Sequence, residues 1–330
     1  MVDAHIPNSE ATPGWKTHKF ARTEFLEAIE TTPLEGFGGS RYAGNAPVDW
    51  CSGTGSRGKL PVLGGFLGAV LINAACQFSR IQFKTRAEHD PLSLYIEFLQ
   101  PVRQGPYHVA LSILQSSASQ ATIMAEIVSA DPAKNIVYCH ATIRVGSLSR
   151  GKTLLEQNIN QKKVVVPDRI KDCSRWVDAF FYYVNPPSTT VRCYTPTGGP
   201  TALWSPAFGG QNVRYMWKKL DNEQTYELEH LPLLVDMIPP LPLNYEDNAL
   251  EGIVKYQLPT ISLKLDFCTN VRGKEWLLSK THMRWLSGNR FEENIKIIDE
   301  DGKFVATCHQ LCGIYPSKYL QEKEKPETRL

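Results

Sequence analysis

The 330-residue chain repeats one order of elements, a helix followed by four strands, in each of its two halves. An offset of 169 residues aligns the two copies without a gap over their final strands. Identities at this spacing are few, but they fall within the repeated elements, so we interpret the chain as a duplicated unit. The identical pairs are Ser93/Ser262, Leu94/Leu263, Phe98/Phe267, Val102/Val271, Arg103/Arg272, Lys134/Lys303, Cys139/Cys308 and His140/His309.

Each copy is expected to place one helix before its four strands. Residues 64–78 are apolar on nearly every face, which predicts a buried helix. The second helix is predicted at 230–238, where Pro232 suits the first turn and Pro239-Pro240 ends it. Strands are predicted at 91–102, 108–114, 121–128 and 135–145, then at 213–220 before the second helix and at 260–268, 275–285, 290–299 and 303–314 after it.

The composition of the sequence changes between the two copies. Residues 147–210 carry charged patches and Pro/Gly clusters, which indicate loops with one or two short elements. We therefore predict three parts: an N-terminal unit at 1–150, a loop-rich linker at 151–210 and a C-terminal unit at 211–330.

The two copies differ in polarity at three positions of the alignment. Where the first has Leu67, Pro91 and Ala141, the second has Asp236, Thr260 and Gln310. A carboxylate among apolar neighbours is costly to bury without partners, and a hydroxyl and a carboxamide are suitable partners. Together the three could hold a water molecule, with the carboxylate as its base. The alternative is an Asp at a helix end that points to solvent, with the other two incidental.

The last strand contains Cys308-His309-Gln310-Leu311-Cys312, which first suggests a thiol or metal site. Successive side chains of a strand point to opposite faces, so Cys308 and His309 cannot pair with each other. No second Cys/His cluster has zinc-like spacing, and we expect no metal. The eight cysteines form no C-x-x-C framework and are expected to be buried apolar side chains rather than disulfides. Gln310 is then the residue of interest.

Other classes of protein lack their signatures here. Ser52-Gly53-Thr54-Gly55-Ser56 has the wrong order for a serine hydrolase elbow, and no G-x-G-x-x-G lies between a strand and a helix. A formal net charge of +2 implies neither nucleic acid nor an anionic membrane. The hydrophobic share of 42% supports a globular core.

Location is inferred from the longest apolar run and the two ends of the chain. The run at 63–76 is too short to span a membrane, and residues 1–13 lack the layout of a signal peptide. We expect a cytoplasmic protein. The ending Thr328-Arg329-Leu330 is similar to a peroxisomal targeting signal but is also typical of a solvated tail.

Several segments together resemble the double hot-dog thioesterases, the acyl-CoA thioesterase II-like family with its fungal-type relatives. The resemblance covers both halves and rests on 63–67 (LGGFL), 89–93 (HDPLS), 98–102 (FLQPV), 259–263 (PTISL), 275–278 (EWLL) and 299–303 (DEDGK). It implies an α+β tandem hot-dog, with two antiparallel sheets that each wrap a long central helix. Its polar trio falls on Asp236, Thr260 and Gln310, at spacings of 24 and 50 residues. Family members often have Asp two residues after the Ser/Thr, where this chain has Ser262.

The function that the resemblance implies is hydrolysis of an acyl thioester, with acyl-CoA or a carrier-bound acyl thioester as the partner and no cofactor. Asp236 would act on a water held by Thr260 and Gln310, and the site would lie between the halves. Backbone N–H groups at Gly64 and Gly65 would face the thioester oxygen. Two alternative functions stay open: a hot-dog dehydratase, cyclase or product-release enzyme for a polyketide-type thioester, and a non-catalytic acyl-binding module. A homo-oligomer also stays open.

Overall fold

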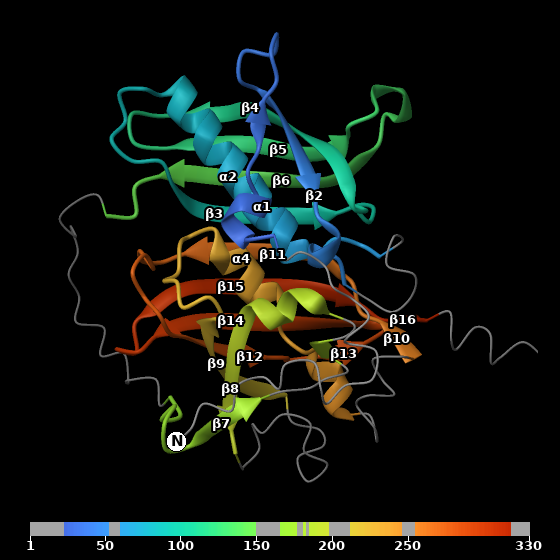
Figure 1. Ribbon diagram of the computed structural model, residues 1–330, viewed down its shortest axis with the longest axis vertical. Helices are drawn as coiled ribbons and strands as arrows, with labels where there is room; N and C mark the ends of the chain where they lie inside the picture. The colour runs from blue at the N-terminus through green and yellow to red at the C-terminus, as the bar shows by residue number, and fades with distance from the viewer. Residues whose placement is uncertain are drawn as a thin grey trace, which may run out of the picture.

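The computed structural model describes residues 23–52, 60–149, 166–176, 181–182, 185–197, 212–245 and 255–317. In these residues one antiparallel sheet of fourteen strands runs through both halves of the chain (Figure 1). In sheet order its strands are β1 (Thr32–Pro33), β2 (Arg41–Ala46), β4 (Gly105–Ser116), β5 (Ala121–Ser129), β6 (Val137–Gly146), β3 (Asp90–Phe98), β11 (Thr260–Phe267), β15 (Phe304–Gly313), β14 (Arg290–Asp299), β12 (Leu277–His282), β9 (Val213–Leu220), β8 (Val191–Pro196) and β7 (Cys173–Trp176). Strand β13 (Leu286–Ser287) pairs with β14, and β10 (Tyr256–Gln257) pairs with β16 (Tyr315–Pro316).

The two halves meet where β3 pairs with β11. Tyr95 lies opposite Lys264, and the pairs on either side of them mirror each other, with Leu94 opposite Leu265 and Ile96 opposite Leu263. This register makes a local two-fold relation at the seam, and it matches the offset of 169 found in the sequence. The two predicted sheets are therefore joined edge to edge into one sheet. Because these central strands pair with each other, neither leaves an unpaired edge at the seam.

The repeat shifts by two residues at the last strand of each half. Leu94 pairs with Ile143 on β6, and its counterpart Leu263 pairs with Gln310 on β15. The counterpart of Gln310 in the sheet is thus Ile143, not Ala141, and Ala141 corresponds to Cys308. The bulges near the starts of β3 and β11 lie at matching places and do not cause this shift. It arises because the connection from Asp299 to Phe304 in the second half is shorter than that from Ser129 to Val137 in the first. The Cys-His dipeptides therefore do not occupy corresponding positions, which corrects the sequence alignment.

The helices of the two halves differ in length. Helix α2 (Gly64–Gln82) has 19 residues, and its buried side includes Phe66, Leu67 and Leu71. Helix α4 (His230–Asp236) has only seven residues, so the prediction of a long central helix in each half is wrong for the second. Pro239 and Pro240 lack the N–H groups that would extend α4. A short helix, α1 (Phe25–Ala28), precedes β1.

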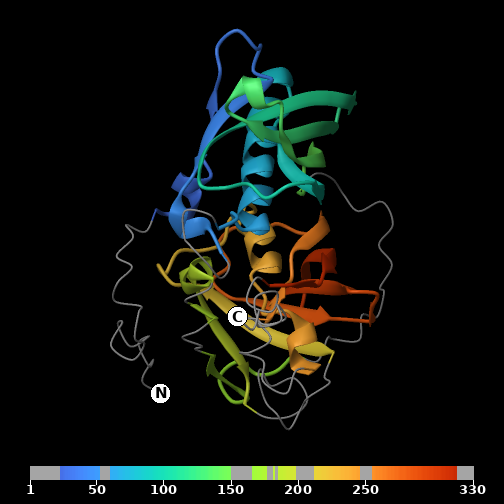
Figure 2. The ribbon, with the colours of Figure 1, turned by 90° about the vertical axis from the view of Figure 1, so that its right-hand side faces the viewer.

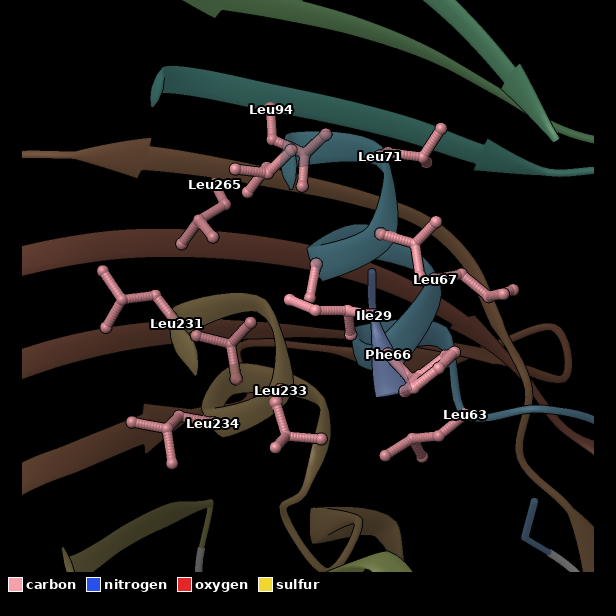
Figure 3. Close-up of a cluster of buried hydrophobic side chains, with 14 of the residues drawn as sticks. Ile29, Leu63, Phe66, Leu67, Leu71, Leu94, Leu231, Leu233, Leu234 and Leu265 are labelled. Atoms are coloured by element: carbon pink, nitrogen blue, oxygen red, sulfur yellow. The ribbon is translucent and has the colours of Figure 1, made fainter. Parts of the chain in front are cut away.

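A single main core lies between the sheet and the helices of both halves. Leucines of α2 and α4 point into it beside Leu94 and Leu265 of the central strands (Figure 3). In the side view, α2 in blue and α4 in yellow-orange follow one another along the inner side of the sheet (Figure 2). Because one connected cluster contains buried side chains of both halves, the two halves share this core.

Part of the predicted linker adds to the second half of the sheet. β7 and β8 lie within 151–210: β8 pairs with β9, and β7 pairs with β8 as the outer edge of the sheet. The sequence predicted one or two short elements there without placing them. Residues 1–13 and the Thr328-Arg329-Leu330 ending lie outside the described residues. In the described part of the chain, no helix has the length and apolar character to cross a membrane.

Candidate active site

Asp236 is the last residue of α4, and its carboxylate points at the first turn of α2 in the other half. The backbone N–H of Gly65 donates to Asp236 Oδ2 at 2.7 Å. No side chain caps the N-terminus of α2 from its own N-cap position, which is Leu63. Asp236 therefore supplies the cap across the seam, where a carboxylate is favoured by the N–H groups and the helix dipole.

Two glycines allow this close approach of α2 and α4. A Cβ atom on Gly65 would lie 2.5 Å from the carbonyl oxygen of Pro232 and 2.8 Å from the Cα atom of Leu233. On Gly64 it would lie 3.3 Å from Asp236 Oδ2. The backbone of α2 thus packs against α4 at a distance that a side chain would prevent.

Thr260 contacts the other oxygen of the same carboxylate. Its hydroxyl lies 3.3 Å from Asp236 Oδ1 and donates to it. Thr260 begins β11, just before a register shift in the pairing with β15. The Sγ atom of Cys312 lies 3.9 Å from Thr260 Oγ1. The irregularity at the strand start turns the hydroxyl toward α4.

Gln310 reaches the site through the helix backbone rather than the carboxylate. Its side-chain amide donates to the carbonyl oxygen of Val235, the residue before Asp236, at 3.0 Å. On β15 the side chains of Cys308, Gln310 and Cys312 are buried, while His309 points outward and lies 2.9 Å from Glu292. The predicted alternation of this strand is confirmed. The structure therefore brings all three residues of the trio together, with Gln310 one residue removed from the carboxylate.

Asp236 is partly exposed, although Val235 and Met237 on either side of it are buried. The surrounding apolar core raises the pKa of its carboxyl. N–H groups of Gly65 and Gly64, the Thr260 hydroxyl and the charge of Lys218 act in the opposite direction. A carboxylate with a raised pKa, on a residue that keeps partial exposure, is suited to accept a proton.

The amides of Gly64 and Gly65 both face Asp236. An acyl carbonyl that reached this turn of α2 would share its N–H groups with the carboxylate. Their role toward a thioester oxygen stays a prediction.

Sequence reasoning missed three charged side chains on the inner face of the second half: Arg214, Lys218 and Glu293, all buried. A signal was present, because Arg214 and Lys218 alternate with Met216 and Leu220 on one face of the predicted strand. Among the described residues, no cluster of His, Cys, Asp and Glu could hold a metal ion. All eight cysteines are free thiols.

Two protein-family models match the chain. The model of the acyl-CoA thioesterase N-terminal domain matches residues 54–146, and that of the acyl-CoA thioesterase C-terminal domain matches residues 172–314. No curated protein matches the chain.

Solved structures share the fold at low sequence identity. A candidate thioesterase II from Thermobifida fusca YX superposes with a TM-score of 0.65 at 17% identity, covering 89% of this chain and 98% of that one. A hot-dog protein of unknown function from Alicyclobacillus acidocaldarius gives 0.64 at 16% identity, with 89% and 99% covered. An acyl-CoA thioesterase II from Mycobacterium marinum gives 0.61 at 14% identity, with 90% and 100% covered. The fold is therefore the hot-dog fold, and the matched models span both halves.

Proposed function

Since its two halves match the N- and C-terminal domains of acyl-CoA thioesterases, the chain belongs to that family of thioester hydrolases, and we propose that Asp236 is its general base. The observation that carries the proposal is the Asp236 carboxylate, held between the Gly65 N–H of one half and the Thr260 hydroxyl of the other. We further propose that the two halves are two hot-dog units in one chain, with the site at their seam.

In the proposed reaction, Asp236 removes a proton from a water molecule as its oxygen bonds to the thioester carbonyl carbon. The carbonyl π electrons move to the oxygen, where amides of the first turn of α2 would stabilise the charge. Return of these electrons breaks the C–S bond, and the leaving thiolate takes the proton from Asp236. The products are a carboxylic acid and a thiol.

Thr260 and Gln310 have supporting roles in this proposal. Thr260 bonds one carboxylate oxygen and fixes its rotation, and Gln310 holds the Val235 carbonyl beside it. The remaining hydrogen-bonding capacity of the Gln310 carboxamide could orient the water. Positioning of this kind matters because a small displacement of a reacting group lowers the rate strongly.

The test is release of free thiol from acyl-CoAs of graded chain length, repeated with the same acyl groups on an acyl carrier protein. We expect thiol release from at least one of these thioesters. Loss of one water in mass without thiol release would favour a dehydratase, and binding without turnover an acyl-binding module. Either result would overturn the proposal.

A further inference from the structure

The backbone around Asp236 is held by side chains from the sheet. We call residues 234–241 the exit segment, because they lead out of α4. The Lys218 ammonium donates to the Leu234 carbonyl at 2.6 Å and to the Met237 carbonyl at 3.4 Å. These two carbonyls flank Asp236 on both sides along the chain. A short helix leaves its last carbonyls without helical partners, and Lys218 satisfies two of them.

Two further side chains fasten the same segment. Arg214 donates to the Pro239 carbonyl and, at 2.7 Å, to Asn244 Oδ1. Glu293 accepts a hydrogen bond from the Leu241 N–H at 2.9 Å. Lys218 is the member of this set that contacts the residues next to Asp236, and its side chain has no solvent exposure.

A neutral donor would satisfy the same carbonyls at a lower desolvation penalty. Moving an ammonium into an apolar core is unfavourable unless opposite charges compensate it. The carboxylates of Asp236 and Glu293 both act on Lys218 electrostatically. A fully buried cation next to the proposed base therefore indicates that its positive charge has a function.

We propose that Lys218 is the positioning residue of Asp236: it fixes the backbone carbonyls of Leu234 and Met237 on either side of that residue and supplies the positive charge that keeps it ionised. This inference rests on the proposed role of Asp236 as the base. Lys218 touches no reacting atom in this scheme and acts through Asp236 alone.

The titratable groups of this core come from four strands. Lys218 and Arg214 on β9 are the cations, and Glu293 on β14 is the other carboxylate. The thiols nearby are Cys193 on β8 and Cys308 and Cys312 on β15, and burial raises the pKa of each, so they are neutral. Burial lowers the pKa of Lys218 to about 8 and raises that of Glu293 to about 7. Below pH 8 Lys218 is therefore protonated, while Glu293 carries its negative charge only above about pH 7.

The experiment compares the pH dependence of kcat/KM for thiol release in wild type, Lys218→Gln, Lys218→Met and Lys218→Arg. Gln keeps a donor without the charge, Met removes both, and Arg keeps the charge. Loss of an adjacent opposite charge raises a carboxyl pKa by about one unit or more. We expect the acidic limb to move to higher pH by about one unit in the Gln and Met variants, with KM little changed. The Arg variant is expected to retain the wild-type limb.

Lys219→Gln is the matched control, because Lys219 lies on the same strand but bonds Glu223 and Glu275 at the surface. Its acidic limb should be that of wild type. Unchanged limbs in Lys218→Gln and Lys218→Met would show that Lys218 only holds the fold, and would overturn the proposal. If those two do not fold, Lys218→Arg decides: a limb at the wild-type pH supports the proposal, and a limb moved to higher pH although the charge is kept would overturn it.

Failure of the proposed function is separable from failure of this inference. If the wild type releases no thiol, the function fails. The Asp236 carboxyl can then still be titrated by infrared spectroscopy, assigned by the band lost in Asp236→Asn. A higher titration midpoint in Lys218→Gln than in wild type supports the inference, and equal midpoints contradict it.

Discussion

The two halves share one strand order but fill their inner faces differently. Along one row of the first half, Leu94 on β3 pairs with Ile143, which pairs with Ile123. The matching row of the second half runs from Leu263 through Gln310 to Glu293. Both rows are buried. Two apolar side chains of one half are thus replaced by a carboxamide and a carboxylic acid in the other.

The helices of the two halves also differ, with apolar packing around the first and polar contacts at the end of the second. Helix α2 keeps its backbone hydrogen bonds over 19 residues and is covered by apolar side chains. Helix α4 stops after seven residues, and side chains of the sheet satisfy its last carbonyls. The polar side chains in the core of the second half therefore supply the hydrogen bonds that the shortened helix cannot make within itself. The first half contributes a rigid helix N-terminus, and the second contributes the carboxylate that faces it.

The largest effect is expected from Asp236→Asn, which keeps the size of the side chain and removes the base. Turnover should fall by about 10²–10⁴-fold, the range for a positioned general base. Thiol release per folded enzyme is the measurement. Asp266→Asn is the control, because Asp266 is an exposed partner of Lys264 at 3.2 Å. Near wild-type turnover in Asp236→Asn would show that the second half does not contribute the base through Asp236.

The two rows are compared by making the polar position of one apolar and the apolar position of the other polar. Gln310→Leu should lower turnover by about 10²-fold, because the Val235 carbonyl loses its donor and the carboxylate beside it shifts. Ile143→Gln should leave the activity of the folded protein unchanged and destabilise it by about 1–3 kcal/mol, because the buried carboxamide has no partner. Thiol release and urea unfolding of both variants give the result. Equal loss of activity in both would mean that the first-half row also serves the site.

The contact between α2 and α4 is tested by adding a single methyl group. Gly65→Ala should destabilise the protein by about 1–3 kcal/mol, because its Cβ would meet backbone atoms of α4. Gly68→Ala should have a smaller effect, since the nearest atom there is the Pro232 side chain at 3.0 Å. Urea unfolding measures both. An effect at Gly65 no larger than that at Gly68 would indicate that the two helices separate easily.

The smallest expected effect concerns stability against pH. Burial raises the pKa of Asp236 in the folded protein, so the fold favours the protonated form. The stability that this group contributes is greatest at low pH and falls as pH rises through the folded-state pKa. Asn resembles the protonated form, so Asp236→Asn should melt above wild type at pH 8, with a difference that shrinks on acidification. A lower melting temperature at every pH would show that the charged carboxylate stabilises the cap on α2.

Elements with a strong local pattern could be predicted from the sequence. The start of α2 at Gly64 and the bounds of β9 and β14 agree with the predictions, because periodicity and turn residues mark them. Strand β2 was not predicted, and the short elements expected at 151–210 were not placed, since strands of only four to six residues have little periodicity to detect. The shift of two residues at β15 was also missed, because the ungapped alignment does not allow for the shorter connection between β14 and β15. Lys218 and Glu293 were missed because a charged residue in a strand is ordinarily taken as solvent-facing.

The sequence by itself determined the duplication, the apolar first helix, the stop at Pro239-Pro240 and the separation of Cys308 from His309. All of these follow from local periodicity and backbone chemistry. Only the tertiary structure decided that Asp236 caps a helix 171 residues away, and that Lys218 holds the carbonyls beside it. Such contacts depend on how two sheets join and how closely two helices cross. Those distances are set by packing of the whole chain, which no single stretch of sequence contains.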